Sequence, residues 1–445
     1  MALTNLTTFL KENYALFGVL LGYAIVSISL GPYSNFDTQT EYAAASSVVE
    51  MGLPYATPGN LINQPPIGFY IDAVFLKIFG LSYATGVAVI TLFGVGCVFL
   101  VYKLGKTFYG KRTGLFSAGI FALTPWHVVI SRSFLIDTQC LFFSLFSLFI
   151  GIWAIRKASL KLALASGLLF GVALLTKLFA IFTLIPMAVI FAYYAPKSLK
   201  RGLSQIVLFA LPSLIMHYLW YEVISRLGFF SIFTHTDFLS FNQGATPSPF
   251  FLIRFFIDNP GSLFLLATII SVSLSLWVRE HSTKIAFFDF VCLATILGTA
   301  IVNIFLVLNL GLWVPYVDPV KYDYQLLPAF CLLAASLAPK AYLAAKTVPH
   351  EAKRRKLILA AAAIGLTLLA GSVLLNMQTL QTLTAQEYIV FRVEGDVGFS
   401  FVRLAPTIAQ HYLSAFQGLG FVLIVASLVL ANRDAFLMSK KKHES

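Results

Sequence analysis

The sequence predicts an all-helical protein that crosses a membrane many times, and three observations carry this prediction. Of the 445 residues, 58% are hydrophobic and 11% are charged, whereas soluble domains carry roughly a quarter charged residues. Apolar runs close to the ~20 residues that a helix needs to cross the hydrocarbon layer recur along the whole chain. Lys and Arg occur in short clusters between these runs, as they do in the cytosolic loops of membrane proteins.

The apolar runs predict about twelve spans and one transmembrane domain, 1–445, because no gap between the runs has the size of a soluble domain. The predicted spans are 15–31, 82–102, 114–131, 137–155, 163–176, 178–194, 203–222, 261–278, 285–310, 323–339, 357–376 and 415–431. The two short runs 163–176 and 178–194 are either two spans or one broken hairpin around Thr176 and Lys177.

The basic residues test this assignment, because an error in the order of the spans would scramble them between the two faces. With both termini in the cytosol, 23 of the 31 Lys and Arg lie on the cytosolic side, and 13 of the 19 Asp and Glu lie on the outer side. Acidic residues contribute little to topology, so their bias indicates either chemistry on the outer face or solvation of its loops. Nucleic acid is not an expected partner, because the basic residues form no stripe or tail.

Three outer loops are long, at 32–81, 223–260 and 377–414, and loops of this size usually have a function. Within the first loop, Thr40–Glu50 and Ile67–Phe79 have helical periodicity with apolar and aromatic faces. This pattern predicts two helices that lie along the membrane interface without crossing it.

The first outer loop opens with the segment Asn35–Tyr42, which contains two carboxylates. If a helix begins here, Asp37 lies at its amino end, where the backbone dipole favours a negative charge, and Glu41 follows one turn later on the same face. An ordinary helix cap is the alternative interpretation. Further on, Pro65 and Pro66 fix the entry into the amphipathic segment that contains Tyr70.

Three ionisable residues stand at the edges of predicted spans. Asp137 begins the fourth span, five residues after Arg132, which is an available ion-pair partner. A carboxylate at the edge of the hydrocarbon costs a few kcal/mol unless it is paired or wetted, so it marks either a functional site or a structural ion pair. Lys177 is isolated in an apolar stretch, where it either extends to the surface or faces an anion in a cavity.

Further outer-side candidates lie in the second half of the chain. Arg254 is a cation in the loop 223–260, and Lys321 stands between Asp318 and Asp323, beside Tyr322. Anchoring in the interfacial aromatic belt explains the tyrosine but not the lysine.

Taken in order, these motifs resemble the C-type integral-membrane glycosyltransferases, specifically the relatives of protein O-mannosyltransferases and aminoarabinose transferase. The resemblance covers most of 30–195 and again about 318–330. It rests on five motifs in order. The first outer loop opens with an acidic residue, Asp37, and a Pro-Pro segment follows at Pro65-Pro66. Arg132 and Asp137 flank two spans, and a Leu-Thr-Lys at 175–177 and a later Tyr with Leu-Pro, within Tyr322–Pro328, complete the set.

The chain also departs from the family's pattern. Thr38 follows Asp37 where the family often has an adjacent Asp-Glu, and Gln64 stands where the family often has His or Lys before Pro-Pro. A cationic role for position 64 is therefore not carried over. No large soluble domain follows the last outer loop, which argues against an oligosaccharyltransferase.

The resemblance implies a reaction on the outer face in which a sugar moves, with inversion, from a polyprenyl or dolichyl phosphate to a protein, lipid or glycan acceptor. Asp37 is the expected general base, a role typically worth about 10²–10⁴-fold in rate. Asp137 is the second expected catalytic residue, which shapes the pocket or holds Arg132. The leaving phosphate is expected to contact Arg132, Lys177, Arg254 and Lys321. Glu41, Tyr70 and Tyr322 complete the expected substrate-binding set.

Because cations can hold the leaving phosphate, no obligate metal cofactor is expected, with a divalent metal as the open alternative. The seven histidines show no ligand spacing. The alternative function is a secondary transporter of a small anionic or sugar-like solute, although the chain lacks a convincing internal repeat and its midspan regions are almost free of charge. A noncatalytic scaffold would leave the ionisable residues on one face unexplained. The expected location is a prokaryotic plasma membrane, where membrane lipids are further partners.

Overall fold

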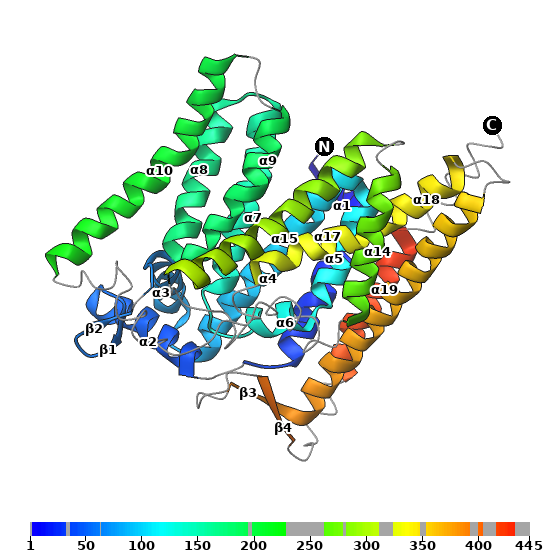
Figure 1. Ribbon diagram of the computed structural model, residues 1–445. Helices are drawn as coiled ribbons and strands as arrows, with labels where there is room; N and C mark the ends of the chain where they lie inside the picture. Colours follow the sequence, from blue (N-terminus) through cyan, green and yellow to red (C-terminus); the bar gives the residue numbers. More distant parts are fainter. Residues whose placement is uncertain are drawn as a thin grey trace.

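The computed structural model describes residues 2–32, 36–62, 64–194, 198–227, 262–278, 282–310, 324–347, 353–391, 399–403 and 415–431. Long helices packed side by side make up almost all of it (Figure 1), which confirms the all-helical class. The larger helices of the first half are α1 Ala2–Ser29, α4 Tyr83–Tyr109, α5 Lys111–Ala122, α6 Pro125–Ser131, α7 Asp137–Arg156, α8 Leu160–Thr176, α9 Leu184–Tyr194 and α10 Leu199–Arg226. Those of the second half are α14 Ser262–Val278, α15 Thr283–Leu310, α17 Leu327–Ala335, α18 Leu337–Thr347 and α19 Lys353–Gln386.

The described helices lie where the spans are predicted. Six of them are long and apolar enough to cross a membrane, and a seventh span results if the bent pair α5 and α6 counts as one. Shorter apolar helices occupy the remaining predicted spans, at Asn13–Ser29, Leu160–Thr176, Leu178–Tyr194, Leu265–Leu276 and Ala415–Ala431. The protein is therefore polytopic, while the count of twelve and the cytosolic side of both termini stay predictions.

The helical structure is interrupted between α8 and α9. The sequence allowed either two spans or one broken hairpin at this place. Thr176 ends α8, Lys177 has an extended backbone with a φ of −159°, and a 3₁₀ helix, η1 Leu178–Thr183, leads into α9. The break releases the Lys177 side chain from the helical repeat, and that side chain is buried.

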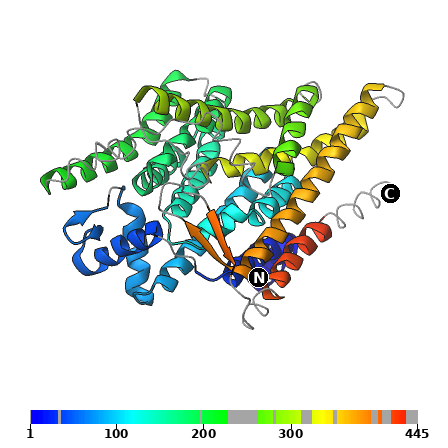
Figure 2. The ribbon, with the colours of Figure 1, turned by 60° about the horizontal axis from the view of Figure 1, so that its bottom comes forward.

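The first predicted outer loop forms a small unit with its own core. It contains α2 Phe36–Met51, the short antiparallel strands β1 Tyr55–Thr57 and β2 Asn60–Leu61, and α3 Ile67–Phe79. The two predicted interfacial segments are therefore both helices. Ala44, Phe69 and Leu76 pack there against Phe134 and Ile136, just before α7. Both views place this unit at one corner of the molecule (Figure 1, Figure 2).

The segment 377–414 contains more regular structure than a loop. Helix α19 continues to Gln386, and the antiparallel strands β3 Glu387–Phe391 and β4 Phe399–Arg403 follow. Figure 1 places this hairpin at the same end of the helical bundle as α2 and α3. Most of the other long predicted loop, 223–260, lies outside the described residues.

The first and last described helices pack together through glycines. A Cβ atom at Gly22 would lie 2.6 Å from the Gly420 carbonyl oxygen, and one at Gly18 would collide with the Ser427 side chain. Such contacts let two helix backbones approach closely, as small residues do in membrane proteins. The helix Ala415–Ala431 thereby closes the bundle against α1.

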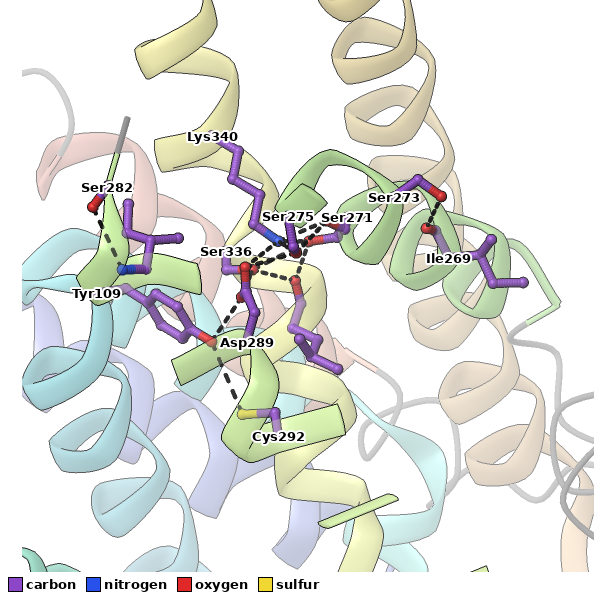
Figure 3. Close-up of polar contacts among 12 residues, drawn as sticks. Tyr109, Ile269, Ser271, Ser273, Ser275, Ser282, Asp289, Cys292, Ser336 and Lys340 are labelled. Carbon is purple, nitrogen blue, oxygen red and sulfur yellow. Dashed lines mark hydrogen bonds and ion pairs between the residues drawn. The ribbon is translucent and has the colours of Figure 1, made fainter. Parts of the chain in front are cut away.

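A buried ion pair joins the second half of the chain to α4 (Figure 3). Lys340 Nζ lies 2.8 Å from Asp289 Oδ2 and also donates to the Ser271 carbonyl at 2.7 Å and to Ser275 Oγ at 2.9 Å. Asp289 Oδ1 accepts from the Tyr109 hydroxyl at 3.0 Å. Ser271 Oγ is a fourth acceptor at 2.9 Å, so the three N–H donors of the ammonium are all satisfied. This cluster is therefore structural, and the sequence analysis did not identify it.

Replacing Lys340 with Met is expected to destabilise the protein by about 3–5 kcal/mol, because it leaves the Asp289 carboxylate buried without its counter-ion. The double variant D289N/K340M is expected to recover part of this loss, since it removes both charges. Thermal unfolding in detergent measures both effects. K346M, which removes an exposed lysine of the same helix, is the matched control, and an equal loss in K346M would contradict the assignment.

Candidate functional site

The second buried ion pair lies where the sequence places the functional residues. Asp137 is the first residue of α7 and Lys177 directly follows α8, and both side chains are buried. Lys177 Nζ lies 2.7 Å from Asp137 Oδ2. The dipole of α7 favours the carboxylate at its amino end, and that of α8 favours the cation at its carboxyl end. The helix ends therefore stabilise the same pair that holds them together.

The two buried ion pairs differ in how many N–H donors of the lysine are already used. Among the described residues, Asp137 is the one hydrogen-bond acceptor of Lys177 Nζ, whereas an ammonium has three donors. Lys340 uses its donors on α14 and Asp289. Lys177 thus retains N–H groups for an anionic ligand, and Lys340 does not.

Arg132 precedes Asp137 by five residues in the chain. It ends α6, is 7% exposed, and belongs to the connection that leads to Asp137. Thr91 of α4 holds the preceding turn through a 3.0 Å hydrogen bond to the Ser131 carbonyl. The sequence analysis named Arg132 as the available partner of Asp137. It missed Lys177 in this role because the packing of α7 beside α8, which spacing along the chain does not show, brings the two residues together.

Glu41 connects the small unit of α2, β1, β2 and α3, called the outer unit below, to the start of α7. Its buried carboxylate accepts from the Ile136 backbone N–H at 2.8 Å and from the Gln64 amide at 3.4 Å. Ile136 directly precedes Asp137, so this bond fixes α2 against the start of α7. Glu41 therefore positions α2 in the structure, and its predicted substrate contact stays a prediction.

Asp37 lies one turn before Glu41 on the same face of α2. It stands in the first turn of this helix, as predicted, and its side chain is exposed. The contact of Glu41 with Ile136 therefore brings α2, the helix that contains Asp37, to the start of α7, where Asp137 pairs with Lys177. The grouping of Asp37 and Arg132 with this pair stays a prediction.

A further buried carboxylate, Asp72 of α3, escaped the sequence analysis. Its Oδ1 accepts from the Gln139 side-chain amide of α7 at 2.5 Å. Burial raises the pKa of Asp72 well above its ordinary value, the bond from Gln139 lowers it, and the charge of Glu41 raises it further. The position of Asp72 in the sequence could have indicated its burial, because it shares a helix face with Gly68, Phe69 and Leu76, which are all buried.

Gly68 permits this close packing. It lies one turn before Asp72, and a Cβ atom there would lie 2.8 Å from Ile136 Cγ2 and 2.9 Å from Gln139 Oε1. Any side chain at position 68 would push α3 away from the start of α7.

The other predicted site residues divide into two groups. Tyr70 donates its hydroxyl to the Gly52 carbonyl at 2.8 Å, which fastens α3 to the end of α2, and its substrate contact stays a prediction. Arg254, Lys321 and Tyr322 lie outside the described residues. Tyr324, close to the last two in sequence, is held by a 2.6 Å hydrogen bond to His127 Nδ1.

The described part of the chain contains no group of three or more His, Cys, Asp and Glu side chains with the geometry of a metal site. The expectation that the protein needs no obligate metal cofactor stays a prediction.

Comparison with known proteins finds a family similar to the part of the chain that contains four of the residues discussed above. Residues 63–220 match the family described as dolichyl-phosphate-mannose-protein mannosyltransferase. The matched segment is about a third of the sequence. It includes Asp72, Arg132, Asp137 and Lys177, whereas Asp37 and Glu41 precede it. The match confirms the resemblance to C-type glycosyltransferases.

Two proteins of Bacillus subtilis strain 168 are similar to part of the chain. The putative mannosyltransferase YycA is 30% identical over 148 residues, which are 33% of this chain and 22% of that protein. The putative mannosyltransferase YkcB is 29% identical over 147 residues, 33% of this chain and 20% of that protein. The matches therefore span about a fifth of these relatives.

A solved structure shares the fold over nearly the whole chain. ArnT from Cupriavidus metallidurans, bound to undecaprenyl phosphate, matches with a TM-score of 0.56 and 16% identity, over 94% of this chain and 78% of that chain. The archaeal oligosaccharyltransferase AglB from Archaeoglobus fulgidus matches with a TM-score of 0.51 and 15% identity, over 83% of this chain and 56% of that chain. At these identities the likeness concerns the fold. It extends well beyond residues 63–220, the segment that matches the mannosyltransferase family.

Replacing Gly68 with Ala is expected to destabilise the protein by about 1–3 kcal/mol, because the added methyl group overpacks the contact with Ile136 and Gln139. Thermal unfolding in detergent measures this loss. Gly418→Ala is the matched control, since no atom lies within 4 Å of its Cβ position and Ala is the better helix former by up to about 1 kcal/mol. Equal stability of the two variants would contradict the close contact at Gly68.

Proposed function

We propose that the protein is a membrane glycosyltransferase that moves a sugar from a polyprenyl-phosphate donor to an acceptor, with inversion at the anomeric carbon. The single observation that carries this proposal is the buried Lys177 at the end of α8, held by Asp137 and left with N–H donors for an anion. The mannosyltransferase-family match over 63–220 supports the same reaction class. The ArnT structure with undecaprenyl phosphate supports a lipid phosphate as the donor's carrier.

The donor phosphate is expected to bind between Lys177 and Arg132. Two cations match the charge that develops on the phosphate when the bond from the anomeric carbon to the phosphate oxygen breaks. Asp137 has an indirect role here, because it holds the Lys177 ammonium in one orientation. A group fixed in this way loses little freedom when the ligand binds.

Asp37 is the proposed general base. As the acceptor hydroxyl oxygen attacks the anomeric carbon, its proton passes to the Asp37 carboxylate and the lipid phosphate leaves on the opposite side of the sugar. Asp37 is exposed at the start of α2, where an acceptor can reach it from water. Glu41, one turn later, keeps α2 against α7 through the Ile136 N–H.

The proposed location is a bacterial plasma membrane, with the site on the outer face. The Bacillus subtilis relatives support the bacterial assignment, and the excess of carboxylates on the predicted outer side supports the orientation. The acceptor is a protein, lipid or glycan that reaches this face.

Replacing Asp37 with Asn is expected to lower the transfer rate by at least about 100-fold, because a positioned base contributes about 10²–10⁴-fold. Membranes that contain the variant are incubated with radiolabelled polyprenyl-phosphate mannose and native acceptors, and labelled product is counted. E50Q, which alters an exposed carboxylate at the other end of α2, is the matched control. Full transfer by D37N would exclude Asp37 as the base.

Replacing Lys177 with Met is expected to weaken binding of polyprenyl phosphate by about 10-fold or more, since hydrogen bonds to charged groups contribute about 1.5–3 kcal/mol. The variant also leaves Asp137 buried without its counter-ion, so its stability is expected to fall. D137N/K177M separates the two effects, because it removes the unpaired charge and should regain stability without regaining binding. K77M, at an exposed lysine of α3, should bind normally. Recovery of binding in the double variant would show that Lys177 acts through stability alone.

A further inference from the structure

The contact between α3 and α7 contains a carboxyl group and a primary amide that the proposed reaction does not use. Asp72 and Gln139 are both fully buried, and Gln139 Nε2 donates a hydrogen bond to Asp72 Oδ1. The described residues offer no donor to the remaining oxygen of either group, Asp72 Oδ2 and Gln139 Oε1. Two buried acceptors without donors would cost the desolvation of both oxygens.

A single proton on Asp72 removes this cost. A carboxylic acid and a primary amide each present one donor and one acceptor side by side. Once Gln139 Nε2 donates to Oδ1, a hydroxyl at Oδ2 can donate to Gln139 Oε1. Both oxygens are then satisfied by one closed pair of hydrogen bonds.

The surrounding charges favour the protonated form. The titratable residues of the elements packed against α3 are mostly acidic or phenolic: Asp37, Glu41, Tyr42 and Glu50 of α2, Tyr83 at the start of α4, and Asp137 with Lys177 at the ends of α7 and α8. Lys177 is already paired with Asp137. Burial and the charge of Glu41 both raise the pKa of Asp72, so a second buried carboxylate beside Glu41 is disfavoured.

We infer that Asp72 is a neutral carboxylic acid that forms a cyclic pair with the Gln139 amide and thereby fixes the start of α7 against α3. Gln139 lies two residues after Asp137, and Gly68 lies one turn before Asp72 on the same face of α3. The pair therefore sets the place of Asp137, and through it of Lys177. Asp72 is a positioning residue, and its effect on catalysis rests on the proposed function of that ion pair.

Asparagine distinguishes a neutral pair from a charged one. D72N keeps the shape and offers an N–H to Gln139 Oε1 in place of the hydroxyl, so transfer from polyprenyl-phosphate mannose is expected to stay within about threefold of the original protein. D72L has a similar volume but leaves the Gln139 amide without partners, and its kcat is expected to fall at least about tenfold. Loss of activity in D72N equal to that in D72L would overturn the inference.

The protonation state is tested without any enzymatic reaction. Infrared spectra of the purified protein in detergent at neutral pH are expected to contain a buried carboxylic-acid carbonyl band that disappears in D72N. Absence of this band difference would overturn the inference even if D72L proved inactive or unfolded.

The pH dependence of stability gives a second readout with a fixed sign. Because the pKa of Asp72 is raised in the folded state, the folded protein keeps a proton on this carboxyl group that the unfolded chain releases above a pH of about 3.8. The original protein should therefore lose stability relative to D72N as the pH rises from about 5 to 8, and a constant difference would contradict a neutral Asp72. If the original protein transfers no sugar from polyprenyl-phosphate mannose while these two readouts hold, the proposed function fails and the pairing of Asp72 stands.

Discussion

The ion pair between Asp137 and Lys177 is the interaction on which the candidate site depends. Each charge lies at the helix end whose dipole favours it, and the pair joins the start of α7 to the end of α8 over 2.7 Å. Removal of either charge would leave the other buried without its counter-ion. In the proposed function, the N–H groups that Lys177 does not use on Asp137 bind the phosphate of the lipid donor.

The remaining site residues reach this centre through short links. Glu41 holds α2 by the N–H of Ile136, and Asp72 holds α3 by Gln139. Both links end within two residues of Asp137. Movement of the outer unit would therefore shift Asp37 relative to Lys177, and the spacing between the proposed base and the phosphate site is set by helix packing and not by a flexible loop.

Composition and periodicity were sufficient to predict the helical, polytopic class, because a helix that crosses hydrocarbon requires a long apolar run. The order of the motifs was sufficient to predict the kinship that the match over 63–220 confirms. The partner of Asp137 could not be read from spacing, since Lys177 is forty residues away in the chain and meets it through packing. Asp72 was missed because a carboxylate inside an amphipathic helix is usually solvated, and its burial depends on Gly68. The ion pair of Asp289 with Lys340 was missed for the same kind of reason, because the residues around it come from four helices and the turn at Ser336.

The glycine contacts between α1 and the helix Ala415–Ala431 bear on how the chain is made. Synthesis proceeds from the amino end, so α1 enters the bilayer almost four hundred residues before its partner exists. During that interval lipid must cover the face that contains Gly18 and Gly22, and the arrival of the last helix displaces it. The contact between α1 and the helix Ala415–Ala431 therefore forms only after most of the other described helices have been made.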